Sequence, residues 1–395
     1  MKILVVNCGS SSLKYQIFDI EQGSFNLLAK GSATRIGIEG SIIEHKPSGK
    51  EECSIKKPLK NHKEAMLAIE PLLTDDKYGV LEDISEINGI GHRVVHGGEV
   101  FKSSVVIDED VIRDIDKLSK FAPLHNPANL TGIQTCRQLM DAPNVAVFDT
   151  AVHQTMPAKA FMYGLPLEYY KNKGIRKYGF HGTSHDFVSA EAAKLIGKPF
   201  EQCRIITCHL GNGSSITAFK DGKVQDTSMG LTPLQGVLMG TRCGDVDPAA
   251  VLSVMQSDGI MPKQMDEILN KKSGLLGLAG SSDLRDVMNM AEQGNQDAKN
   301  AVEILVYSIQ KYIGSYLASL GGADAVVFTA GIGENNPIIR DNVLSCFGFA
   351  GIKVDKSKNV AGEKVFSTDD SKVKALLIPT NEELMIAMDT YKMIS

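Results

Sequence analysis

The sequence predicts an α/β protein of two related domains, on three observations. Short apolar runs typical of strands alternate with longer segments of helical periodicity. One strand–turn–strand pattern occurs at the start of the chain and again in its middle. The 395 residues also exceed the roughly 250–300 at which a single hydrophobic core usually stops growing. Two domains, each with a central sheet, are therefore expected.

The repeated pattern is a pair of strands joined by a Gly/Ser turn. The first copy runs from the apolar residues 3–7 through CGSSS to a second strand that ends at Asp19. The second copy, residues 205–219, passes through HLGNGSS. Glycine lets backbone N–H groups approach a ligand, and successive N–H and hydroxyl donors form a nest that suits phosphate. Two such nests indicate two domains that face one polyphosphate.

The remaining elements follow in order along the chain. Strands are expected at 87–95, 145–150, 204–208, 325–329 and 375–378, and helices at 126–139, 186–195 and 298–320. The hairpin-like openings imply a mixed sheet in each domain. The motif NEE before an apolar run predicts an N-capped terminal helix. We expect domain I to cover 1–150 plus the helix from about 383 to 395, and domain II to cover 151–382.

Composition and charge exclude several classes of function. Hydrophobic residues at 43% and charged residues at 23% are ordinary for a globular protein, and a net charge of −5 gives no basic footprint for nucleic acid or a membrane surface. No apolar run approaches the roughly 20 residues that span a bilayer, and no secretory signal opens the chain. Seven cysteines without a CxxC pair indicate a reducing, cytoplasmic setting.

Three Gly-rich turns are candidates for phosphate binding. They are 9–12, 211–215 and 331–335, each after an expected strand. None matches GxxxxGK[ST], and the set does not fit GxGxxG at the start of a helix. A single loop of this kind is most often an ordinary turn, whereas three together favour a nucleotide. Lys14 lies just beyond the first turn, where it can reach a phosphate or remain an exposed strand residue.

Charged residues at strand ends suggest how a phosphoryl group would be held. Arg93 ends an apolar strand and Arg242 lies in a Gly/Asp loop. Either can form a structural salt bridge, but two arginines in Gly-rich settings suit a transferring phosphoryl group, whose charge needs positioned cations. Asp149 ends another strand, where it can hold Mg²⁺ indirectly, orient a nucleophile or cap a turn.

Histidines are concentrated in two short motifs. His181 and His185 are four residues apart, as are His92 and His96. On a helix this spacing can ligate zinc, but Gly182 and the lack of a neighbouring glutamate base weaken that interpretation. We expect His181 to donate to a developing anion, with buried, hydrogen-bonded side chains as the alternative for the other three.

Taken together, these segments resemble the acetokinase family of the acetate and sugar kinase, heat-shock 70 and actin superfamily. The matching motifs are VVNCGSSSLKY (5–15), GHRVVHGG (91–98), APLHNPAN (122–129), VFDTAVH (147–153), YGFHGTSH (178–185), CHLGNGSS (208–215), MGTRCGDVDP (239–248), FTAGIGENN (328–336) and PTNEEL (379–384). They span almost the whole chain in family order. The resemblance implies two duplicated βββαβαβα domains of the ribonuclease H-like, actin-like ATPase type, with the active site in the interdomain cleft.

The resemblance also implies an activity, namely reversible phosphoryl transfer from ATP to acetate, giving acetyl phosphate and ADP. It implies Mg²⁺ as cofactor, with Mn²⁺ as a substitute, and a homodimer formed through the second domain. The catalytic roles would fall to Asp149, His181, Arg242 and Arg93. Substrate would contact Arg93 and an apolar pocket of Val95, Leu124, Phe180 and Pro233.

The resemblance further assigns the nucleotide and metal. ATP would contact Lys14, His209, Leu210, Gly211, Asn212, Gly213, Asp283, Leu284, Arg285, Gly331, Ile332, Gly333, Glu334 and Asn335. Asn7 and Glu382 would help to place the metal, although the adjacent Glu383 leaves the choice of glutamate open. Acetate is ionised at neutral pH, so the kinase direction needs no general base. This argues against a base role for Asp149.

Two alternatives remain open from the sequence. The first is a propionate or butyrate kinase on the same scaffold. Its substrate is longer than acetate by one or two methylenes, and each methylene changes the binding free energy in an apolar pocket by only about 1–3 kcal/mol. A chaperone-like or filament-like ATPase of the superfamily is a second alternative, although no peptide-binding domain is appended. Acetate-dependent ADP formation separates the kinases from such a module.

Overall fold

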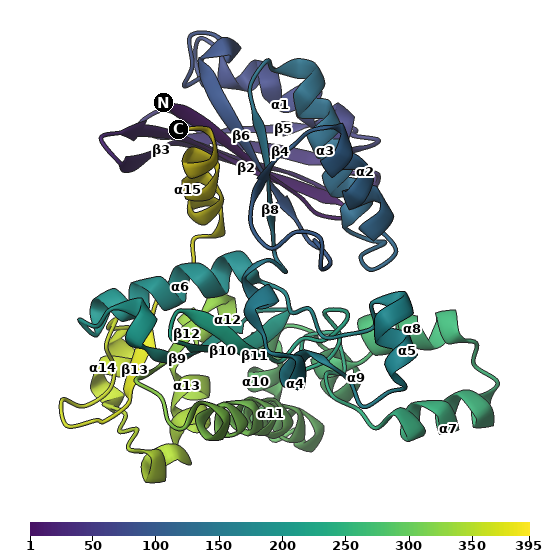
Figure 1. Cartoon of the computed structure of the whole chain (residues 1–395), viewed down its shortest axis with the longest axis vertical. Coiled ribbons are helices and arrows are strands. Elements are labelled where there is room, and N and C mark those ends of the chain that lie inside the picture. Colours follow the sequence, from purple (N-terminus) through teal and green to yellow (C-terminus); the bar gives the residue numbers. More distant parts are fainter. The chain divides into compact units, whose positions relative to one another are not determined.

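The computed structural model describes all residues, Met1–Ser395, and they form two compact units. Unit 1 comprises Met1–Val152 and Asn381–Ser395, and unit 2 comprises His153–Thr380. Each unit has its own central sheet with helices packed on it (Figure 1). The α/β class expected from the sequence is confirmed.

Unit 1 contains an eight-stranded mixed sheet of order β5-β4-β3-β2-β1-β6-β8-β7. Strands β1 to β5 pair in antiparallel fashion, whereas β1, β6 and β8 are parallel. Its elements are β1 (Lys2–Cys8), β2 (Ser12–Glu21), β3 (Ser24–Thr34), β4 (Ile42–Pro47), β5 (Cys53–Lys56), α1 (His62–Leu73), the 3₁₀ helix Ile84–Glu86, β6 (Ile87–Val94), β7 (Val105–Val106), α2 (Glu109–Leu118), α3 (Asn126–Leu139), β8 (Asn144–Phe148) and α15 (Glu382–Ile394).

Both faces of the unit 1 sheet are covered, which explains the continuous apolar run of β1. Leu4 and Val6 point into a core shared with α1, whereas Ile3 and Val5 pack with Ile386 of α15. Figure 1 shows α15, in yellow, against the purple strands. Gly91 permits this approach, because a Cβ there would lie 2.3 Å from the Thr390 hydroxyl. The expected N-cap is confirmed, since the Asn381 side chain accepts from the Leu384 N–H.

Unit 2 has a five-stranded sheet of order β11-β10-β9-β12-β13. Its elements are the 3₁₀ helix Val152–Thr155, α4 (Ala158–Phe161), α5 (Leu167–Lys173), α6 (Gly182–Leu195), the 3₁₀ helix Phe200–Gln202, β9 (Arg204–Leu210), β10 (Ser214–Lys220), β11 (Lys223–Thr227), α7 (Pro248–Asp258), α8 (Pro262–Lys271), α9 (Gly274–Ala279), α10 (Leu284–Glu292), α11 (Gln296–Leu320), β12 (Ala325–Thr329), α12 (Ala330–Asn335), α13 (Pro337–Leu344), the 3₁₀ helix Phe347–Ala350, α14 (Lys356–Ala361) and β13 (Lys374–Leu377). No helix of the chain is both long and apolar enough to cross a bilayer.

The two sheets share one topology at their centres. The order β3-β2-β1-β6-β8 in unit 1 corresponds to β11-β10-β9-β12-β13 in unit 2. In both, the first three strands pair in antiparallel fashion. The fourth strand, β6 or β12, pairs in parallel with β1 or β9, and the fifth, β8 or β13, pairs in parallel with the fourth. The repeated sequence pattern therefore forms the equivalent strand pairs β1–β2 and β9–β10.

Two local predictions were wrong. Residues 331–335 are not a turn, because α12 begins at Ala330 directly after β12. Ala330 takes a left-handed φ of +63°, and the Glu334 carboxylate accepts from its N–H, so side-chain capping overrides the low helix propensity of two glycines. Helix α6 starts at Gly182, earlier than expected, because left-handed His181 stands immediately before it.

Candidate active site

In unit 1 the β1–β2 turn is held by buried polar contacts. Asn7 and Lys14 are directly opposite each other on the two strands and so lie on one face of the sheet. The Gly9 N–H donates to the Ser12 carbonyl at 2.8 Å, and Asn129 Nδ2 donates to the Cys8 carbonyl at 2.7 Å. Lys14 is exposed and lines a groove with Glu383, consistent with either sequence interpretation of this lysine.

Arg93 and Asp149 form a two-pronged ion pair across the ends of β6 and β8. Arg93 Nε and Nη2 donate to the two carboxylate oxygens of Asp149 at 2.9 and 2.7 Å. Asp149 is 1% exposed and Arg93 20%. Burial opposes the guanidinium charge, but the Asp149 and Glu382 carboxylates outweigh it and raise the pKa of Arg93. Because Asp149 occupies the Nε and Nη2 donors, an N–H group on Nη1 of Arg93 can still bind another carboxylate or phosphoryl group.

Two side-chain oxygens that could ligate a metal ion lie near Arg93. Asn7 Oδ1 lies 3.5 Å from Arg93 Nη1, and Glu382 Oε2 lies 3.8 Å from Arg93 Nε. No cluster of three or more His, Cys, Asp or Glu side chains could hold a metal by itself. An amide oxygen and one carboxylate nevertheless fit Mg²⁺, which usually takes one or two protein ligands and completes its shell with water and phosphate oxygens. Glu383 lies instead in the groove with Lys14.

Unit 2 gathers three segments at the carboxyl ends of β9 and β12. His209 and Thr329 are paired in register, which sets the turn 211–213 beside the start of α12. Gly240 brings a third segment close, because a Cβ there would lie 1.9 Å from Asn212 Oδ1. Only glycine allows that approach. Of the nucleotide residues expected in this turn, His209 and Leu210 are buried and Asn212 is exposed.

The segment 331–335 also lies at the carboxyl end of β12, but its Glu334 side chain bonds to the protein backbone. Glu334 Oε1 accepts from the N–H groups of Ala330 at 2.8 Å and Thr380 at 3.1 Å. Its carboxylate therefore holds the loop rather than presenting itself to phosphate. Gly331 and Asn335 are exposed and Ile332 is partly buried, whereas Gly333 is buried against the backbone of β9 and β12.

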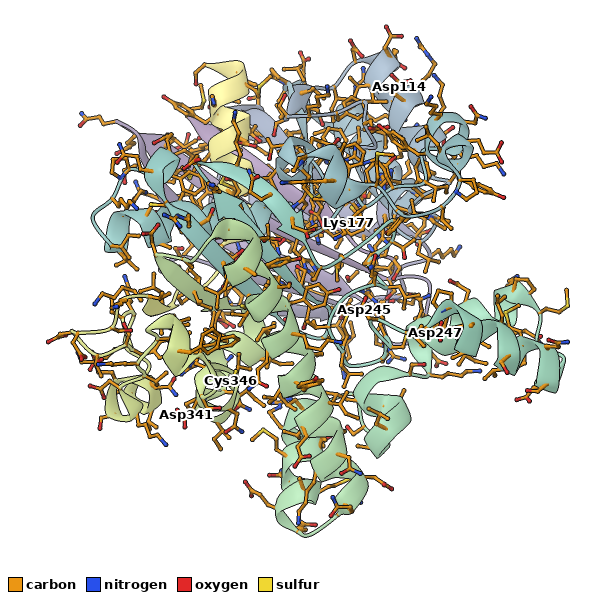
Figure 2. All side chains as sticks on the ribbon, turned by 60° about the horizontal axis from the view of Figure 1, so that its bottom comes forward. Asp114, Lys177, Asp245, Asp247, Asp341 and Cys346 are labelled. Carbon is orange, nitrogen blue, oxygen red and sulfur yellow. The ribbon has the colours of Figure 1, made fainter.

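Arg242 is a half-buried cation that makes no ion pair. Its Nη1 donates to the Pro233 carbonyl at 3.1 Å, and burial lowers its pKa. The loop around it is fixed by Asp245, which accepts from the Tyr312 hydroxyl at 2.6 Å and whose N–H donates to the Gly236 carbonyl at 2.8 Å. Figure 2 shows Asp245 beside the body of unit 2 and Asp247 at the start of the projecting helix α7. The arrangement presents an uncompensated positive charge that suits an anionic ligand.

His181 converges with Arg242 on the second Gly/Ser turn. A Cβ at Gly213 would lie 3.3 Å from Arg242 Nη1 and 3.6 Å from His181 Nε2. His181 has φ +57°, a left-handed conformation that costs a non-glycine residue about 1–3 kcal/mol and is typical of functional sites. Its ring stacks on His209 at 4.2 Å, and its Nδ1 is 2.9 Å from the Ser215 hydroxyl.

The remaining predicted residues are more dispersed. Asp283 caps α10 and is paired with Arg285 at 2.6 Å, while Arg285 is 86% exposed and Leu284 buried. Val95 and Leu124 of the expected apolar pocket belong to unit 1, whereas Phe180 and Pro233 belong to unit 2. Leu124 is largely exposed. Their grouping into one pocket remains a prediction.

His92, His96 and His185 are buried, as the alternative interpretation of these three histidines expected. His92 is buried with its Nε2 2.7 Å from Asn144 Oδ1, and burial lowers its pKa to about 4. His185 is fully buried between two hydroxyls, and His96 is fully buried as well. No zinc-type cluster is formed.

Sequence reasoning missed the residues that support the loops. Arg340 is 1% exposed and donates through Nη1 to the Gly333 carbonyl at 2.7 Å. Thr380 Oγ1 donates to Ser184 Oγ at 2.7 Å, and that hydroxyl is 2.8 Å from His209 Nδ1. Ser215 joins His181 to His185. Arg340 alone offered a signal, because it follows two isoleucines and a buried polar group needs a partner.

Comparison with known proteins supports a relationship over the whole chain. Residues 2–388 match the sequence model of the acetokinase family. The chain belongs to the acetokinase family. It is 54% identical over 399 residues to an acetate kinase of Thermoanaerobacter pseudethanolicus, covering 100% of this chain and 99% of the relative.

Solved structures agree with the sequence match. An acetate kinase of Porphyromonas gingivalis superposes with a TM-score of 0.94 at 43% identity, covering 100% of both chains. A propionate kinase of Francisella tularensis superposes with a TM-score of 0.92 at 40% identity, covering 99% of both. A protein named acetate kinase and one named propionate kinase thus share this fold.

Proposed function

We propose that this chain catalyses reversible transfer of the γ-phosphoryl group of ATP to acetate, giving acetyl phosphate and ADP, with Mg²⁺. The observation that carries the proposal is that Arg242, which makes no ion pair, and His181 Nε2 converge on the Gly213 turn. Full-length identity above 50% with a protein named acetate kinase supports the choice of acceptor.

In unit 1, Arg93 would hold the acceptor. Its Nη1 edge points away from Asp149 and can take a carboxylate or phosphoryl oxygen. Both oxygens of Asp149 accept from Arg93, so Asp149 would act by fixing the guanidinium. No base is required, because acetate is ionised above about pH 5.

In unit 2, Arg242 and His181 would stabilise charge on the transferring group. An acetate oxygen forms the new bond to phosphorus while the bond to the ADP oxygen breaks, and ADP leaves with the electron pair. Removal of one such positioned donor typically costs 10²–10³-fold in rate. The turn 209–213, the start of α12 and the Asp283–Arg285 segment would hold the nucleotide.

Asn7 and Glu382 are the residues that would hold the metal. When bound, Mg²⁺ supplies charge neutralisation on the phosphate oxygens. Proximity to Arg93 supports Glu382 over Glu383 in this role. Mn²⁺ prefers the same oxygen donors and would substitute.

The test is formation of acetyl phosphate from acetate and Mg-ATP, trapped with hydroxylamine as the hydroxamate. We expect hydroxamate and ADP in equal amounts, both dependent on acetate. ADP formation indifferent to any small carboxylate would reject the kinase assignment and favour a chaperone-like ATPase.

Propionate is the second candidate acceptor, because a propionate kinase shares this fold at 40% identity. One methylene changes binding by about 1–3 kcal/mol, or roughly 10- to 200-fold. We expect kcat/KM to favour acetate over propionate and butyrate. The reverse order would identify a propionate kinase.

We also propose a cytoplasmic homodimer that associates through unit 2. No residue of α7 is buried, and Leu252 on this helix is 64% exposed. An apolar side chain so exposed on a projecting helix favours a protein partner. All seven cysteines are free thiols, in keeping with a reducing compartment.

A further inference from the structure

A chain of hydrogen bonds runs from the core of unit 2 to the ring of His181. Thr207 Oγ1 is 2.7 Å from His185 Nδ1, and His185 Nε2 is 2.6 Å from Ser215 Oγ. Ser215 Oγ is in turn 2.9 Å from His181 Nδ1. Thr207, His185 and Ser215 are all 0% exposed. We call these three residues the relay.

We propose that the relay holds His181 in the tautomer that carries its hydrogen on Nε2, the ring atom nearest Gly213 and Arg242. The three residues come from β9, α6 and β10, so rigid elements fix each of them. They act as positioning residues, because the atoms nearest to a Cβ at Gly213 belong to Arg242 and His181 and not to the relay. The inference rests on the phosphoryl-transfer role proposed for His181.

Two polarities of the relay leave every buried hydroxyl hydrogen with an acceptor. If Ser215 instead accepted from both histidine rings, its own hydroxyl hydrogen would be buried without an acceptor, because its side chain hydrogen-bonds only to His181 and His185. Burial lowers the pKa of His185 well below its usual value, so its ring is neutral and has one N–H. In one polarity Thr207 donates to His185, His185 to Ser215, and Ser215 to His181 Nδ1, which leaves the His181 hydrogen on Nε2. In the other polarity every bond is reversed, and the His181 hydrogen lies on Nδ1.

The charges around His181 decide between the two. In the reversed polarity a neutral ring would turn the bare lone pair of Nε2 toward the site where a phosphoryl oxygen must bind. Protonation would remove that repulsion, but it would set a second cation beside Arg242, whose Nη1 adjoins the same Gly213 position. Neighbouring positive charge disfavours an imidazolium. The forward polarity instead gives a neutral ring that donates through Nε2, with no proton drawn from solvent.

Compared with the forward polarity, the reversed polarity allows one additional hydrogen bond, and that bond is weak. The reversed polarity frees the Thr207 hydroxyl to donate to the Thr217 carbonyl at 3.4 Å. This distance lies outside the usual range for O–H···O bonds, so its loss costs little. A charge-assisted bond from His181 Nε2 to a phosphoryl oxygen is roughly twice as strong as a neutral one. Phosphoryl binding therefore selects the forward polarity.

The direct test is the ¹⁵N spectrum of the His181 ring at pH 7.5 with saturating Mg-ATP, assigned by the signal lost in His181→Gln. We expect the pattern of a neutral ring protonated at Nε2. A ring protonated at Nδ1, or an imidazolium, would overturn the proposal. This readout does not depend on acetate kinase activity, so it separates failure of the relay from failure of the proposed function.

A kinetic test uses Ser215→Ala, which breaks the relay beside His181. We expect kcat to fall about tenfold to hundredfold, less than for loss of the donor itself, with KM for ATP within about twofold. Ser215→Thr keeps the hydroxyl and should recover most of kcat. Ser189→Ala is the matched control, because Ser189 is equally buried but donates to the Asp186 carbonyl. Unchanged kcat in Ser215→Ala, or equal losses in the alanine and threonine variants, would refute the relay.

Discussion

Removal of Arg93 should destabilise unit 1 much more than removal of Arg242 destabilises unit 2, although both variants should lose activity. Arg93→Met leaves the Asp149 carboxylate, 1% exposed, without its two donors. Breaking one side of a buried pair costs about 3–5 kcal/mol. Because Arg93 is 20% exposed and partly screened, we expect about 3 kcal/mol, at the lower end of that range.

Arg242→Met should behave differently, because Arg242 has no carboxylate partner. Its loss removes one hydrogen bond to the Pro233 carbonyl, worth about 0.5–1.5 kcal/mol, and also removes the cost of burying an unpaired charge. The two effects oppose each other, so the net change should stay within about 1 kcal/mol of zero.

Hydrogen exchange of β6 and β8 amides measures the stability of unit 1 without assuming that the whole chain unfolds in one step. Arg93→Met/Asp149→Asn is the control and should recover much of the loss, because the buried charge is removed. Equal costs for Arg93→Met and Arg242→Met, or no recovery in the double variant, would refute this account of the two arginines.

Two further predictions concern unit 2. Gly240→Ala should raise KM for ATP at least tenfold with little change in thermal stability, because the new Cβ would lie 1.9 Å from Asn212 Oδ1 and displace an exposed side chain. Gly348→Ala is the control, because no heavy atom lies within 4 Å of its added Cβ, and equal KM values in the two variants would contradict the steric argument. Leu252→Glu should convert a species of about twice 42.7 kDa into the monomer in sedimentation, whereas an unchanged mass would exclude α7 from the interface.

The sequence predicted the fold better than it predicted the contacts within the site. The strand–turn–strand copies, the mixed sheets and the N-cap at Asn381 all follow from local patterns and were found. The pairing of Arg93 with Asp149 was not predicted, because it depends on which parallel strands are neighbours. The start of α12 was missed because its glycines favour a turn. The segment is held by the bonds that Glu334 accepts from Ala330 and Thr380 and by Arg340, contacts that appear only in the folded structure.

The hydrogen bonds of the relay could not be predicted from the sequence either. The four-residue spacing of His181 and His185 is visible in the sequence, but Ser215 and Thr207 come from two other elements. Nothing in the sequence places those hydroxyls at the two nitrogens of one ring. Left-handed His181 was equally hidden, since no local sequence pattern marks a histidine that takes a positive φ immediately before a helix.

The central claim is that positioned cations promote direct transfer from ATP to the carboxylate, with no covalent intermediate on the protein. The most direct measurement is the stereochemical course at phosphorus, with ATP whose γ-phosphoryl group is chiral through oxygen isotopes and acetate as acceptor. One in-line displacement predicts inversion of configuration in acetyl phosphate. Retention would require two successive displacements through a phosphorylated side chain and would contradict the claim.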